Sequence, residues 1–120
     1  LASEEVDPHE IGRDWTQRLA AGLAHATHVR DAAKLPESRV FDVPFRAFMT
    51  DEIAMVRKIY QHFEMDYTPE AERRMRTFLA ENAADKHGRH CYDLSLGGLD
   101  EPTECKRYAA YQDRYAIPSE

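Results

Sequence analysis

Apolar residues recur at helical spacing in four stretches of this 120-residue chain, and a fifth stretch has the pattern of a strand. The first helix is predicted over residues 11–30, where apolar side chains three or four positions apart define one face. That face consists of Ile11, Trp15, Leu19, Leu23 and Ala26. We interpret this stretch as an amphipathic helix.

Three further helices are predicted from the same kind of spacing, over residues 52–63, 69–82 and 101–115. Two of them have clear start signals. Thr50 or Asp51 can cap the first of the three, because either side chain can accept a hydrogen bond from a free backbone N–H. Thr68 is a good cap for the next, and Pro69 occupies the first helical position, where a missing N–H costs nothing.

Residues 39–45 predict a short strand, because the segment is rich in β-branched and aromatic residues and too short for a helix. Val40 and Phe41 are adjacent, so apolar side chains fall on both sides, as in a parallel sheet covered by helices. Pro44 limits ladder pairing near the end of the segment.

A single buried-type strand cannot satisfy its own backbone donors and acceptors. We therefore expect it to pair with a missing N-terminal part or with another chain. The chain also begins with Leu1 rather than Met, which indicates a piece of something longer. We interpret residues 1–120 as the C-terminal segment of a single α/β domain, mostly α-helical with one buried-type strand.

The chain is acidic, with 22 Asp and Glu against 16 Lys and Arg and a net charge of -6. This charge argues against a nucleic-acid partner, so we interpret the stripe of Tyr108, Tyr111 and Tyr115 as core rather than as a surface that stacks bases. No apolar run approaches the roughly 20 residues of a transmembrane segment, and no secretory signal opens the chain. Cys91 and Cys105 could form a disulfide, but two thiols in such a chain are more typical of reduced, cytoplasmic proteins.

One segment is strongly basic within this acidic background. Five consecutive positions hold four potential cations and a glycine: Lys86, His87, Gly88, Arg89 and His90. Lys86 offers a point charge, Arg89 offers a planar fork suited to phosphate or sulfate, and Gly88 lets the backbone approach a ligand closely. The segment therefore indicates an anion site, although its spacing alone fits a solvated loop between two helices better.

A metal site is a weaker alternative. His25 and His28 lie three residues apart on the first helix, and Cys91 follows two more histidines in the basic segment. Zinc needs three or four converging ligands, nothing in the sequence brings the two groups together, and Arg89 would repel a cation. We therefore predict no metal, and we interpret His25 and His28 as a surface or interface pair.

The order of these segments resembles the C-terminal third of a sulfotransferase of the bacterial and actinobacterial branch, over roughly Trp15 to Ala116. The resemblance rests on the order and spacing of the segments Val40–Phe45, Val56–Phe63, Thr68–Ala71, Met75–Asn82, Lys86–His90 and Gly98–Asp100, followed by Tyr111. None of them is diagnostic alone.

This resemblance implies a P-loop-like α/β fold in the complete protein. It also implies transfer of a sulfuryl group from 3′-phosphoadenosine 5′-phosphosulfate (PAPS) to a hydroxyl or amine acceptor, on a small molecule, lipid or glycan. In that family a glycine-rich loop near the N-terminus holds the phosphosulfate, and the general base also lies upstream; this sequence contains neither. The resemblance carries over one role, a loop that closes over the nucleotide, to Lys86, His87, Gly88, Arg89 and His90. We assign no catalytic residue and expect these 120 residues to be inactive alone. The alternative is a small helical protein-interaction module without catalytic activity.

Overall fold

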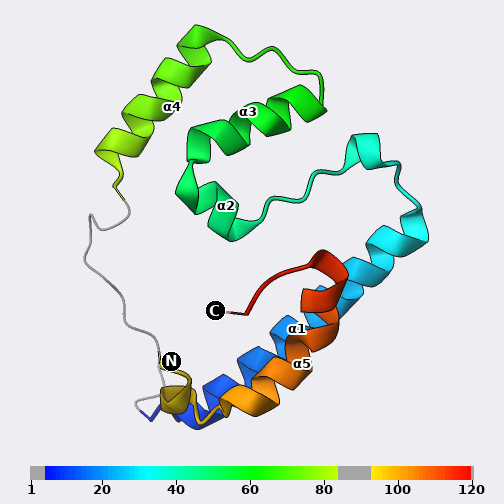
Figure 1. The fold of residues 1–120 in the computed structure, drawn as a ribbon. Helices are drawn as coiled ribbons and strands as arrows, with labels where there is room; N and C mark the ends of the chain where they lie inside the picture. The colour runs from blue at the N-terminus through cyan, green and yellow to red at the C-terminus, as the bar shows by residue number, and fades with distance from the viewer. Residues whose placement is uncertain (1–4, 84–92, 120) are drawn as a thin grey trace. The chain divides into compact units, whose positions relative to one another are not determined.

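The computed structural model describes residues 5–83 and 93–119. The chain divides into two compact units, and each is described by itself. The first unit combines residues 1–34 with residues 91–120, and the second comprises residues 35–90. All regular elements of the described residues are helical (Figure 1).

The first unit contains the long helix α1 (Pro8–Ala33), the short 3-10 helix η2 (Leu94–Gly97) and α5 (Glu101–Tyr115). The Tyr108 hydroxyl donates to the Thr16 carbonyl oxygen at 3.0 Å, and Arg114 pairs with Asp31 at 2.7 Å. Because these contacts advance in the same direction along both helices, α1 and α5 run parallel, side by side (Figure 1).

Two glycines allow η2 to approach the start of α1. A Cβ atom added to Gly12 would lie 2.2 Å from the Gly97 carbonyl oxygen, so only glycine fits at this contact. Gly98 has a φ of 65°, and a Cβ atom there would lie 2.8 Å from the His9 ring. The packing of η2 on α1 therefore requires glycine, which has no Cβ atom, at these two positions.

The second unit contains η1 (Glu37–Arg39), α2 (Phe45–Thr50), α3 (Glu52–His62) and α4 (Pro69–Glu81). Of the two candidate caps for α3, Asp51 is the one that caps it, and the predicted cap of α4, Thr68, is confirmed. The Ala54 N–H donates to Asp51 Oδ1 at 2.9 Å, and the Ala71 N–H donates to Thr68 Oγ1 at 3.1 Å. The buried apolar side chains among the described residues are Ile53 and Met55, both on α3.

The strand predicted over residues 39–45 is not confirmed, because the described residues contain no β-strand. Arg39 ends η1 and Phe45 begins α2, and the residues between them have no regular structure. Val40 is extended, with φ -133° and ψ 137°, and so is Pro44, with φ -65° and ψ 125°. A strand requires a second strand to share its hydrogen bonds, and the described part of the chain offers none.

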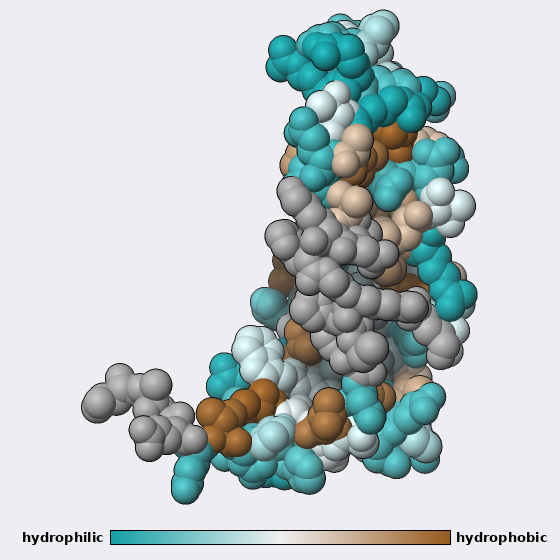
Figure 2. Space-filling view, turned by 90° about the vertical axis from the view of Figure 1, so that its left-hand side faces the viewer, coloured by the Kyte–Doolittle hydropathy of each residue, from teal (hydrophilic) through white to brown (hydrophobic). Residues whose placement is uncertain are grey.

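The apolar face predicted for residues 11–30 is exposed over its N-terminal half. Ile11, Trp15 and Leu19 are exposed, whereas the buried residue of α1 is Thr16. The reason is that η2 and α5 pack against the neighbouring side of the helix. On the face of the molecule that Figure 2 shows, brown hydrophobic patches lie at the surface among hydrophilic residues.

In the described residues, no helix combines the length and the apolar character that crossing a membrane requires.

Candidate functional site: a charged pocket on α3 and α4

The predicted nucleotide loop, Lys86 to His90, lies outside the described residues, as does Cys91. The described chain flanks the segment on both sides. On one side α4 ends at Glu81, and on the other Asp93 caps η2 by accepting a hydrogen bond from the Ser95 N–H at 2.9 Å. The assignment of this loop to nucleotide binding therefore stays a prediction.

His62, the last residue of α3, contacts residues that precede α2 in the chain. Its Nε2 atom lies 2.9 Å from the Glu37 carbonyl oxygen, so this nitrogen carries the proton and donates. Its ring also meets Phe41 edge-on at 5.2 Å. Through these contacts His62 holds η1 and the segment that follows it against the end of α3, so its role is structural.

The histidines and the cysteine that the sequence analysis considered and that the structure describes lie on the surface. His25 and His28 are exposed on α1, and Cys105 is exposed on α5. Among the described residues no group of three or more histidine, cysteine or acidic side chains could hold a metal ion.

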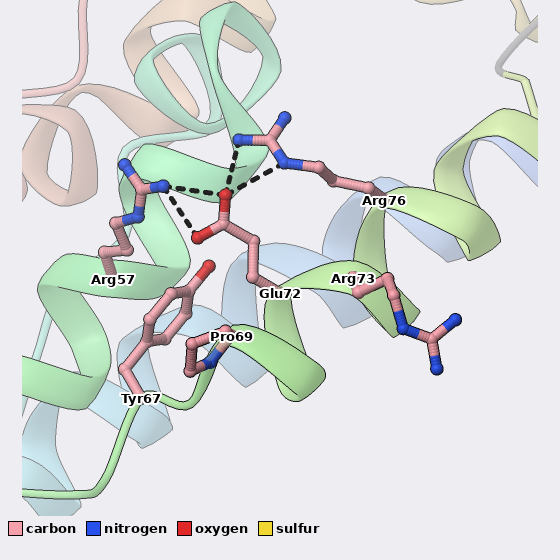
Figure 3. A pocket seen from close by; sticks show the side chains of 6 residues that line it. All are labelled: Arg57, Tyr67, Pro69, Glu72, Arg73 and Arg76. Carbon is pink, nitrogen blue, oxygen red and sulfur yellow. Dashed lines mark hydrogen bonds and ion pairs between the residues drawn. The ribbon is translucent and has the colours of Figure 1, made fainter.

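The described residues do form a pocket in the second unit, with a volume of roughly 470 Å³. Its lining comprises Arg57, Tyr67, Pro69, Glu72, Arg73 and Arg76. Figure 3 shows the Glu72 carboxylate between the guanidinium groups of Arg57 and Arg76, while Arg73 points away from it. These residues were not predicted as a site from the sequence. The signal that could have indicated them is the acidic and basic side chains four positions apart in the stretch that forms α4.

Glu72 joins two helices electrostatically. Nη2 of Arg57, on α3, donates to both carboxylate oxygens at 2.8 and 2.7 Å, and Arg76 donates through Nε and Nη2 at 2.9 and 2.7 Å. Hydrogen bonds from Arg57, and then from Arg76, lower the pKa of Glu72 from 4.5 to about 2. The same carboxylate raises the pKa of Arg57. Glu72 therefore remains ionised over the whole physiological range.

Tyr67 closes one side of the pocket. Its ring meets Tyr60 edge-on at 5.3 Å, and the Arg57 guanidinium lies over it at 5.6 Å. The hydroxyl oxygen is buried without a hydrogen-bond partner. Burial, followed by the neighbouring Glu72 carboxylate, raises the pKa of Tyr67.

The pocket is therefore organised as a junction between α3 and α4. Arg57 and Arg76 are paired with Glu72, and Arg73 is paired with Glu70 at 2.7 Å on the same helix. An anion would have to compete with these carboxylates for the guanidinium groups. The arrangement fixes the orientation of α4, the helix that precedes the predicted loop.

A second polar cluster lies in the first unit. The Thr16 hydroxyl donates to the Glu104 carboxylate, and both side chains are buried between α1 and α5. Nε of Arg107 lies 3.2 Å from Oε2 of Glu104, so the negative charge of the buried carboxylate is paired with a guanidinium group. Sequence periodicity did not reveal this cluster, because buried polar side chains interrupt the apolar pattern.

Comparison with known proteins gives the class to which the chain belongs. The model of the Sulfotransferase family matches residues 2–69, more than half of the chain, and the chain therefore belongs to the sulfotransferase family. No curated protein sequence matches it.

Among solved structures, the chain is similar to sulfotransferase STF9 from Mycobacterium avium, with a TM-score of 0.78 and 26% sequence identity. The match covers 96% of this chain and 29% of STF9, so the chain spans less than a third of that protein's length. The backbone of this chain thus resembles one portion of a sulfotransferase fold. Of the two hypotheses from the sequence, the sulfotransferase is supported.

Proposed function

We propose that this chain forms part of a sulfotransferase domain that transfers a sulfuryl group from PAPS to a hydroxyl or amine acceptor. The observation that carries the proposal is the family match over residues 2–69, supported by the likeness to STF9. We expect a small-molecule, lipid or glycan acceptor and a cytoplasmic location.

Within that domain, the basic segment Lys86 to His90 closes over the nucleotide. Group transfer from PAPS requires cationic groups that bind its phosphates and preorganised positive charge near the developing negative charge. Lys86 and Arg89 supply positive charge in a chain of net charge -6, and the fork of Arg89 suits a bidentate contact with phosphate. The phosphosulfate cradle and the general base come from the remainder of the domain.

The proposal can be tested in a chimera in which these 120 residues replace the matching 29% of STF9. Isothermal titration would measure its affinity for 3′-phosphoadenosine 5′-phosphate. Arg89→Ala is expected to weaken binding by about 1.5–3 kcal/mol, the range for hydrogen bonds to charged groups. Arg89→Lys should recover only part of this loss, because the planar fork is absent.

Arg74→Ala is a matched control, since it removes the same charge from the exposed surface of α4, where Arg74 is paired with Glu70 at 2.8 Å. This variant should bind the nucleotide like the unaltered chimera. Equal affinity of the unaltered chimera and Arg89→Ala would remove the basic segment from the nucleotide site.

A further inference from the structure

An apolar stripe runs along the exposed side of α1. Its large members are Ile11, Trp15, Leu19 and Val29, which are 44%, 58%, 54% and 50% exposed. Gly22 and Ala26 continue the same side between them at helical spacing, and a Cβ atom on Gly22 would meet nothing within 4 Å. The stripe extends over roughly 27 Å, at 1.5 Å per residue.

The stripe is separate from the side of α1 that the first unit already covers. Gly12 and Thr16 face η2 and α5, and Thr27 lies 3.4 Å from the Tyr115 hydroxyl. At about 100° per residue, the two sides are centred roughly 90° apart on the helix. Helix α1 thus has two neighbouring faces, and the described residues of the first unit cover one of them.

We infer that the stripe on α1 is the surface that docks against the remainder of a sulfotransferase domain, the portion that these 120 residues do not comprise. This inference rests on the proposed function, because it takes the chain as one portion of such a domain. Two findings select this occupant. The fold matches STF9 over 96% of this chain but only 29% of STF9, and an exposed apolar stripe of this length is costly in water unless an apolar surface covers it.

Trp15 makes the inference directly testable, because it is the single tryptophan of the chain and, at 58%, the most exposed large side chain of the stripe. Oxidative footprinting with mass spectrometry would compare its reactivity in the 120-residue chain and in the STF9 chimera. We expect oxidation of Trp15 to be at least about fivefold slower in the chimera. Equal rates would overturn the inference, and so would a chimera that does not fold, since the chain would then not fit that place.

Thermal unfolding of matched variants gives a second readout. Leu19→Ser should leave the Tm of the isolated chain nearly unchanged but lower that of the chimera by about 5 °C or more, because Leu19 is buried only there. Val6→Ser is the control: Val6 is 62% exposed and precedes α1, so neither Tm should change. A chimera that unfolds with Leu19→Ser while Val6→Ser stays folded supports docking, and an unchanged Tm with Leu19→Ser overturns it.

Sedimentation of the isolated chain tests the competing occupant. A dimer that Trp15→Ser converts to a monomer would assign the stripe to a second copy and overturn the inference. Failure of the proposed function would give a different result. The chimera would fold and protect Trp15 from oxidation, but it would not bind 3′-phosphoadenosine 5′-phosphate.

Discussion

Thr16 on α1 and Glu104 on α5 form a buried hydrogen bond across the two parallel helices, in which the threonine hydroxyl donates to the carboxylate. The Tyr108 hydroxyl lies 2.9 Å from the same threonine oxygen and donates to the Thr16 backbone carbonyl at 3.0 Å. A buried carboxylate needs such partners, because leaving it unpaired is costly in an apolar environment. The contact therefore fixes the register of α5 on α1.

Replacing Thr16 by Val keeps the shape of the side chain and removes the donor. We expect a loss of about 1–3 kcal/mol in the free energy of unfolding, the cost of leaving a buried polar group without its partner. Urea denaturation would measure it. Thr77→Val is the control, because Thr77 is exposed and its hydroxyl donates only within α4, to the Arg73 carbonyl oxygen at 3.0 Å; equal losses for both variants would contradict the prediction.

The Glu72 junction predicts a specific dependence of stability on pH. Its pKa falls from 4.5 to about 2 on folding, so the junction stabilises the protein fully above pH 4.5 and progressively less as the pH falls toward 2. Glu72→Gln should lower the Tm at pH 7 and flatten its fall between pH 4.5 and 2. Calorimetry at a series of pH values would show this.

Glu70→Gln provides the comparison for Glu72. Glu70 accepts hydrogen bonds from Arg73 and Arg74, which lower its pKa, but all three belong to α4 and are exposed. Exposed pairs within one helix contribute little to stability. A larger effect of Glu70→Gln than of Glu72→Gln would argue against a junction between α3 and α4.

Two glycines of α1 should respond to alanine in opposite directions. Gly22→Ala adds a methyl group in open space and should stabilise the chain by about 0.5–1 kcal/mol, because alanine favours a helix more than glycine does. Gly12→Ala places the methyl group against the Gly97 carbonyl and should destabilise it by about 1–3 kcal/mol through overpacking. Urea denaturation of both variants would check the signs, and stabilisation by Gly12→Ala would contradict the packing of η2 on α1.

The isolated 120 residues should show no sulfuryl transfer above background. Transfer requires a donor site, a base for the acceptor and both held at reacting distance, and only the basic segment is proposed to contribute from this chain. The affinity for 3′-phosphoadenosine 5′-phosphate should be millimolar at best, the scale of an incomplete set of contacts. An assay with labelled PAPS would test this, and turnover by the purified chain would require a complete site within it.

The sequence determined the local features of this protein. Four helices were predicted near their observed positions, and the caps Asp51 and Thr68 act as expected, because a cap depends on residues within one turn. The sequence also indicated the sulfotransferase family, through the order of short segments along the chain, and the family match supports this. The proposed roles of Lys86 to His90 remain predictions from that resemblance.

Tertiary structure decided what the helices bury. Periodicity placed Trp15 on an apolar face, but α5 covers the side of α1 that carries Thr16. The pocket around Glu72 likewise depends on tertiary structure, because its lining residues come from both α3 and α4 and from the segment between them. Residues 39–45 illustrate the same limit, since their β-type composition forms a strand only where another strand can pair with it. Spacing along one chain defines faces, whereas the neighbour that covers each face comes from residues distant in sequence.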